Sequence, residues 1–102
     1  MDRIEQLRKF ISAQPNEAFP RYALALELKA KGDAATAVAE LQELRNRAPD
    51  YLAMYLMLGM ILQTLGRNDE AREALIAGQV LARKQGNTHT LSELTSALEQ
   101  LG

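Results

Sequence analysis

The chain has 102 residues, of which 47% are hydrophobic and 25% are charged, and its formal net charge is −1. This length suits a single domain, and the near-neutral charge gives no overall attraction to nucleic acid or to an anionic membrane. Because there is no cysteine and only one histidine, disulfides, zinc–thiolate sites, cysteine nucleophiles and multi-histidine metal sites are excluded. The first residues form no uninterrupted apolar run of the kind found in secretory signals, so we expect a cytoplasmic protein.

Six segments have the apolar spacing of amphipathic helices, and no segment alternates with the period of a strand. The expected helices cover residues 2–13, 17–31, 34–48, 51–65, 68–85 and 90–101. Asn16, Asp33 and Asp50 are the expected N-caps of the second, third and fourth helices. Thr90 and Glu93 have the spacing of a capping box for the sixth helix, which leaves residues 86–90 as a slightly lengthened loop.

The fourth expected helix lies in the uncharged stretch Tyr51–Gly66, which holds three methionines, Met54, Met57 and Met60. A membrane-spanning helix needs ~20 predominantly apolar residues, and this stretch is shorter and contains Gln63. We therefore expect no membrane contact. A helix that is apolar on all sides is either buried or incompletely covered, so the stretch belongs to the core or to an apolar groove.

The helices form pairs that repeat along the chain. A shift of 34 residues, for example from Leu24 to Leu58, aligns the two copies. The aligned pairs are Leu24/Leu58, Ala25/Gly59, Leu28/Leu62, Gly32/Gly66, Ala37/Ala71 and Leu41/Leu75. The same shift aligns Leu7 with Leu41, so the first helix is expected to be the second half of a truncated unit. Small residues let paired helices approach closely, and the two glycines are expected to adopt a left-handed turn between them.

This pattern resembles the tetratricopeptide repeat. The positions that carry the resemblance are Leu24, Ala25, Leu28, Gly32, Ala37, Leu41, Leu44 and Pro49 in one copy, and Tyr55, Leu58, Gly59, Leu62, Gly66, Ala71 and Leu75 in the next. The whole chain is also similar to short stand-alone bacterial proteins of this type. The resemblance implies one all-α domain, residues 1–102, that forms a helix-turn-helix superhelix of about six helices. Its expected parts are a half-repeat helix at 1–15, repeats at 18–51 and 52–85, and a capping helix at 88–102.

Three positions depart from the family pattern: Arg21 replaces a bulky aromatic residue, Arg83 replaces a proline, and Gly78 replaces an alanine. Without the proline, the fifth helix is expected to run longer. A glycine inside a helix costs ~1 kcal/mol relative to alanine. Gly78 should therefore have a packing reason, and we expect the sixth helix to approach it closely.

The resemblance implies a non-catalytic protein–protein interaction module, because the first helix of each pair lines a concave face in this family. The side chains expected to face this groove are Phe19, Tyr22, Leu26, Lys29, Ala53, Leu56, Met57, Met60 and Gln63. Leu56, Met57 and Met60 are either covered by the sixth helix or part of an open groove for a peptide or an amphipathic helix. The alternative is structural self-association, in which the same apolar face is buried in a homodimer or in an accessory subunit of a complex.

Other chemistries have little support in the sequence. No constellation of base, nucleophile or metal ligand appears, so we expect neither an enzyme nor a cofactor. The single histidine, His89, is expected in a surface loop without a partner. Basic residues are scattered without interleaved aromatics, which argues against nucleic-acid binding. The basic clamp for a C-terminal carboxylate known in this family is not expected either, because the corresponding positions hold Tyr22, Leu26, Met57 and Ser92.

Overall fold

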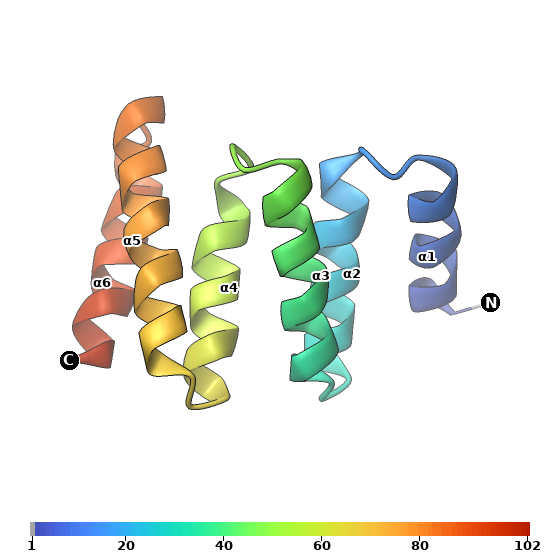
Figure 1. Ribbon diagram of the computed structural model, residues 1–102, viewed down its shortest axis with the longest axis horizontal. Coiled ribbons are helices and arrows are strands. Elements are labelled where there is room, and N and C mark those ends of the chain that lie inside the picture. The colour runs from blue at the N-terminus through green and yellow to red at the C-terminus, as the bar shows by residue number, and fades with distance from the viewer. Residues whose placement is uncertain (1) are drawn as a thin grey trace. The chain divides into compact units, whose positions relative to one another are not determined.

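The computed structural model describes residues 2–102, which form six helices and no strand (Figure 1). This confirms the all-α class and the number of helices expected from the sequence. The helices are α1 (Arg3–Ala13), α2 (Ala18–Ala30), α3 (Ala34–Arg47), α4 (Ala53–Thr64), α5 (Asn68–Gln85) and α6 (Thr88–Leu101). The chain divides into two compact units, Met1–Pro49 with α1 to α3 and Asp50–Gly102 with α4 to α6.

In the first unit, α2 packs against α3 and against α1. The buried apolar side chains of α2 and α3 are Ala23, Leu24, Ala25, Leu28, Ala37, Val38, Leu41 and Leu44. None of the residues of α1 is fully buried. Ion pairs add to its attachment, including Arg3 with Glu27 at 2.9 Å and Arg8 with Glu40 at 3.7 Å. The core of this unit is therefore the α2–α3 pair, and α1 lies on its surface.

Arg21 explains one departure from the family pattern. Its side chain is buried, and Nη1 donates a hydrogen bond to Glu40 Oε1 at 3.0 Å. Nη2 also donates to the carbonyl oxygen of Pro15 at 3.5 Å. A buried guanidinium is stable only when its donors are satisfied, and here they join α2 to α3 and to the turn after α1. A charged network thus occupies the place of the usual aromatic contact.

The turns within both helix pairs depend on glycine, as predicted. Gly32 has φ 86° and Gly66 has φ 76°, in the left-handed region that favours glycine. The residue after Gly32, Asp33, donates its N–H to the carbonyl of Leu28 at 2.9 Å, and the turn at Gly66 makes the equivalent bond. These bonds satisfy carbonyls that the helix end would otherwise leave without partners.

In the second unit, α5 packs against both α4 and α6, and α4 also contacts α6 directly. The buried apolar side chains are Leu52, Met54, Tyr55, Leu58, Ile61, Leu62, Ala71, Ala74, Leu75, Ala82, Leu94 and Ala97. Met54 is inaccessible, Met57 is half-buried and Met60 is 41% exposed. One face of the apolar stretch is therefore core along its whole length, and another face is open to solvent at Met60. No described helix combines the length and apolarity needed to cross a membrane.

Two glycines allow close helix contacts in this unit. A Cβ atom on Gly78 would lie 2.8 Å from Cβ of Tyr55 and 2.9 Å from Cδ2 of Leu94, closer than real Cβ atoms approach. A Cβ on Gly59 would overlap the side chain of Leu75. The predicted close approach of the sixth helix to Gly78 is confirmed. The predicted lengthening of the fifth helix is confirmed as well, because α5 has 18 residues and α3 has 14.

The predicted start of the sixth helix is wrong. The helix begins at Thr88, two residues earlier than expected, and Asn87 is its N-cap. The Asn87 side chain accepts a hydrogen bond from the Thr90 N–H at 2.9 Å, so Thr90 lies inside the helix and forms no capping box. Residues 86–90 consequently form no lengthened loop. Asparagine and threonine are both good N-caps, and the helix begins after Asn87, which comes earlier in the sequence.

Two other predicted caps are also wrong. Glu17, not Asn16, is the N-cap of α2, and it makes no capping bond through its side chain. The Asn16 side chain instead accepts from Arg47 Nη1 at 3.2 Å. Asp50 is not the N-cap of α4. Leu52 holds that position, and its backbone is itself helical. The predicted cap of the third helix is correct, because the Asp33 side chain accepts from the Thr36 N–H at 3.2 Å.

Candidate functional site

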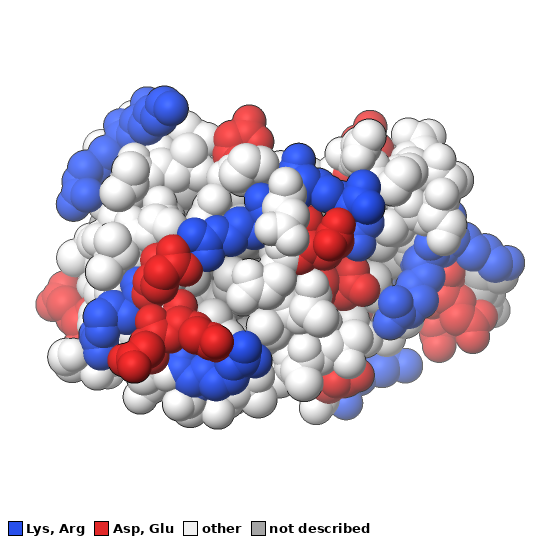
Figure 2. Space-filling model, viewed as in Figure 1, with Lys and Arg blue, Asp and Glu red and all other residues white. Residues whose placement is uncertain are grey.

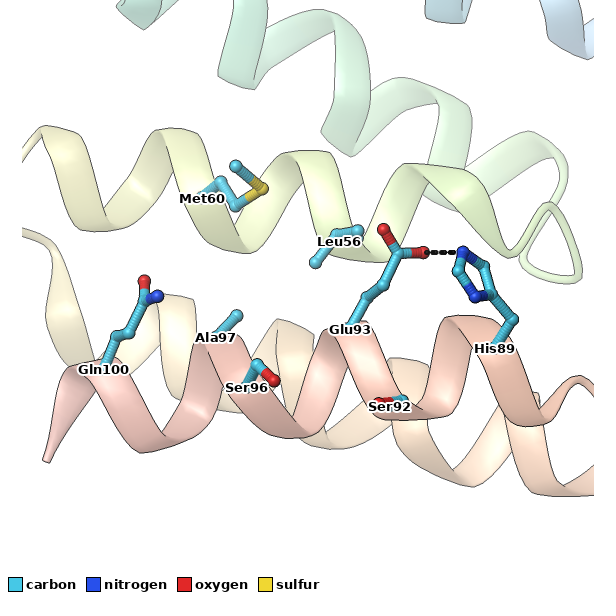
Figure 3. Close-up of a pocket in the computed structure, with 8 residues that line it drawn as sticks. All are labelled: Leu56, Met60, His89, Ser92, Glu93, Ser96, Ala97 and Gln100. Carbon is cyan, nitrogen blue, oxygen red and sulfur yellow. Dashed lines mark ion pairs between the residues drawn. The ribbon is translucent and has the colours of Figure 1, made fainter.

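A cleft of about 320 Å³ lies between α4 and α6 in the second unit (Figure 3). Its lining residues are Leu56 and Met60 of α4, and His89, Ser92, Glu93, Ser96, Ala97 and Gln100 of α6. Leu56 and Met60 are one helical turn apart, so they project from the same face of α4. His89, Glu93, Ser96 and Gln100 follow the same helical spacing along α6. The cleft therefore has an apolar wall on α4 and a largely polar wall on α6.

Interactions with α5 hold α6 in place beside the cleft. Leu94 is inaccessible and packs against Gly78 of α5. Gln79 Nε2 donates a hydrogen bond to Thr95 Oγ1 at 3.0 Å, and Thr95 Oγ1 donates to the Leu91 carbonyl at 2.9 Å. Leu94 and Thr95 thus fix one face of α6 against α5. The polar face that carries Ser92, Glu93 and Ser96 is left toward the cleft and solvent.

The charges of the cleft come from Glu93 and His89. Their Oε1 and Nε2 atoms are 3.6 Å apart, and they form an ion pair only when the imidazole is protonated. The side chain of His89 is 87% exposed and that of Glu93 is 47% exposed. Burial raises the pKa of Tyr51, which does not line the cleft. Within residues 2–102, no group of three or more His, Asp or Glu side chains is placed to hold a metal ion.

Outside the cleft, basic and acidic side chains lie beside one another on the face shown in Figure 2. The exposed charges of the protein include ion pairs between residues three or four positions apart. Arg47 Nε and Glu43 Oε2 are 2.6 Å apart, and Arg67 Nε also pairs with Glu70 Oε2. Such exposed pairs each contribute little free energy.

The structure places the groove residues expected from the sequence on two helices. On α4, Leu56 and Met60 line the cleft, whereas Ala53, Met57 and Gln63 do not. In the first unit, α2 carries the remaining four, Phe19, Tyr22, Leu26 and Lys29. Phe19 is 61% exposed and Lys29 is also exposed, while Tyr22 and Leu26 are half-buried. The role of the whole set in binding stays a prediction.

Most of the polar wall of the cleft lies outside the set of residues predicted from the sequence. His89 does not lie in a loop without a partner, because it is in the first turn of α6 and faces Glu93. Ser96, Ala97 and Gln100 also line the cleft, and the sequence pattern predicts no role for them. A signal was present, since residues 89, 93, 96 and 100 share one helical face opposite the leucines of α6. The helix predicted over 90–101 already contained three of these residues, and only His89 depends on the start at Thr88.

The sequence and the fold of this chain are similar to those of known tetratricopeptide repeat proteins. The profile for the tetratricopeptide repeat matches residues 28–93. A tetratricopeptide repeat domain protein from Salinibacter ruber has 36% sequence identity in two solved structures. Its crystal structure has a TM-score of 0.79 and covers 83% of this chain and 94% of that chain. Its solution structure has a TM-score of 0.81 and covers 86% and 89%. A search of the curated proteins finds no match.

More distant structures share the fold. The protein BPP2914 from Bordetella parapertussis has a TM-score of 0.84 at 23% identity, covering 99% of this chain and 88% of that chain. The TPR2B domain of yeast Sti1, solved in a complex with pHsp70, has a TM-score of 0.90 at 15% identity, covering 96% and 78%. Domains with this fold are generally non-catalytic modules that bind protein or peptide partners. The matched profile spans more than half of the sequence, and the chain belongs to the tetratricopeptide repeat family.

Proposed function

We propose that this protein is a non-catalytic protein–protein interaction module, and that the α4–α6 cleft binds a peptide or a helix of its partner. The observation that carries this proposal is the exposure of Met60 in a concave site. Met54, from the same helix, is inaccessible, whereas Met60 is 41% exposed beside Leu56. Binding sites typically are concave and combine apolar surface with polar groups that orient the ligand, and here α4 supplies the apolar surface and α6 the polar groups.

The repeat register gives each unit its own proposed contact set. We propose residues 18–51 and 52–85 as the two repeats of one domain, preceded by the half-repeat at 1–15 and followed by the capping helix at 88–102. In this register Leu26 is equivalent to Met60, and Tyr22 is equivalent to Leu56. The contact set on α2 is therefore Phe19, Tyr22, Leu26 and Lys29, and the additional set on α4 is Ala53, Met57 and Gln63.

The chemistry of the cleft favours moderate affinity for more than one sequence. Burying one large apolar side chain contributes ~1.5–3 kcal/mol. Two or three such side chains from a ligand would give roughly micromolar binding after the entropic cost of association. Methionine is flexible and polarisable, so Met60 can adapt to ligands of different shape.

The side chains of the cleft favour binding over catalysis. A nucleophilic serine needs a hydrogen bond to a general base. In the described part of the chain, neither Ser92 nor Ser96 makes such a bond to His89, whose side chain is 87% exposed. A site open to water to this degree also does not strengthen the electrostatic interactions on which catalysis depends.

We expect Met60→Glu to weaken peptide binding by at least about tenfold, because a ligand would bury an unpaired carboxylate in the apolar wall. The test is selection from a displayed library of short helical peptides with one face randomised, followed by affinity measurements on the selected peptides. Wild-type protein should enrich apolar side chains spaced i, i+4. The matched control is Val80→Glu, which adds the same charge at a 61% exposed residue of α5 outside the cleft.

Equal binding by the wild type and by a folded Met60→Glu variant would show that the cleft is not the site. Self-association is distinguished by light scattering behind size-exclusion chromatography, from low to high micromolar protein. The proposal predicts a monomer throughout this range. A concentration-dependent dimer that Met60→Glu dissociates, and that Val80→Glu leaves intact, would instead assign the apolar face to a homodimer.

A further inference from the structure

We infer that the partner segment bound in the α4–α6 cleft is a basic amphipathic helix, with a lysine or arginine that pairs with Glu93 beside apolar side chains that contact Leu56 and Met60. This inference rests on the proposed function and specifies the ligand of the same site. It follows from the sign of the charge in the cleft, from the weak partner that Glu93 has in the free protein, and from the position of its carboxylate.

The charge of the cleft is negative wherever His89 is neutral. Among the eight lining residues, Glu93 is the one carboxylate, and none is lysine or arginine. The whole of α6 adds one more acidic residue, Glu99, and no basic one. A ligand with a carboxylate at this place would meet like charge, and one with an ammonium or guanidinium group would meet opposite charge.

Within residues 2–102, the Glu93 carboxylate has His89 as its only charged or hydrogen-bonding partner. The 3.6 Å separation of Nε2 and Oε1 exceeds that of a hydrogen bond, and the imidazole lies on the surface with its side chain 87% exposed. A neutral imidazole offers the carboxylate no opposite charge. A ligand cation therefore has a carboxylate available to it without first breaking a strong ion pair.

The position of Glu93 joins the charged contact to the apolar one. In Figure 3 the Glu93 side chain extends from α6 toward α4 and ends near Leu56, with Met60 farther along the same wall. Leu56 and Met60 are separated by one helical turn, about 6 Å along the axis. A ligand helix has the same rise, so apolar residues at i and i+4 match this wall, and a long basic side chain about one turn away reaches Glu93.

The test uses the same displayed library of helical peptides and compares Glu93→Gln with Glu99→Gln. Both substitutions remove one negative charge from α6, but Glu99 does not line the cleft. Wild-type protein and Glu99→Gln should both enrich lysine or arginine at one position about one turn from the apolar pair. Glu93→Gln should lose this enrichment, keep the apolar preference, and bind the selected peptides about 3- to 10-fold more weakly. The difference should shrink at high salt.

The outcomes separate this inference from the proposed function. Enrichment of apolar residues without basic ones, or a basic preference that persists in Glu93→Gln, would overturn the inference and leave the apolar peptide site in place. A wild-type selection that enriches nothing, or one that Met60→Glu does not change, would overturn both. Enrichment of acidic residues in place of basic ones would contradict the predicted ligand charge directly.

Discussion

Leu94→Ala is expected to lower the free energy of unfolding by about 2–5 kcal/mol, as is typical of leucine-to-alanine changes in a core. Leu94 is inaccessible, and its Cδ2 atom lies against the position of Gly78, so its removal leaves a cavity between α5 and α6. The only other buried residue among those described in α6 is Ala97. Urea denaturation followed by circular dichroism measures the change.

The control for this prediction is Leu98→Ala, a change of the same chemistry at a half-buried residue of the same helix. It should cost clearly less than Leu94→Ala, because less apolar surface returns to water. Equal costs would show that Leu94 is not the principal anchor of α6. A folded Leu94→Ala variant should also lose peptide binding, since the polar wall of the cleft depends on the same anchor.

Gly78→Ala is expected to destabilise the protein by about 1–3 kcal/mol, the usual cost of overpacking a core. The sign of this change is informative. Alanine is the better helix former by ~1 kcal/mol, so the same substitution would stabilise a helix at a position with room for the methyl group. At Gly78 the added Cβ would lie 2.8 Å from the Cβ of Tyr55, an atom that no side-chain rotation can move away. The helix backbones must therefore separate. Thermal unfolding of the variant and the wild type under identical conditions measures the effect.

A second substitution tests this explanation of Gly78. Replacing Ala39, an exposed residue of α3, with glycine should destabilise by ~1 kcal/mol through helix propensity alone. If alanine at position 78 instead stabilised the protein by a similar amount, the close packing of α5 against Tyr55 and Leu94 would be refuted. Close packing would then not be the reason for glycine at position 78.

The repeat could be read from the sequence because its signals are local. Leu24 and Leu58 fall 34 residues apart, and Gly32 and Gly66 mark the turns by a backbone conformation that glycine favours. Gly78 was also informative, since a glycine inside a helix needs a packing reason. For such positions, the type of one residue and its place in the repeat were enough to predict a contact.

Other features depend on a choice between residues that look equivalent in sequence. Asn87 and Thr90 are both good N-caps, and choosing Thr90 shifted the start of α6 by two residues and placed His89 in a loop. Arg21 was visibly unusual, but its partner Glu40 is 19 residues away and no local pattern identifies it. The polar wall of the cleft was missed for a similar reason, because an exposed polar face on a capping helix resembles any solvated surface.

The central claim, that a partner binds in the α4–α6 cleft, is tested most directly by methyl NMR. The three methionines of α4 serve as internal probes in protein labelled at the methionine methyl carbons, titrated with a peptide from the helical library. Binding in the cleft should produce a saturable shift of the Met60 methyl signal, with a much smaller change at the inaccessible Met54. A peptide that binds to saturation and leaves the Met60 signal unmoved would show that the partner does not bind in this cleft.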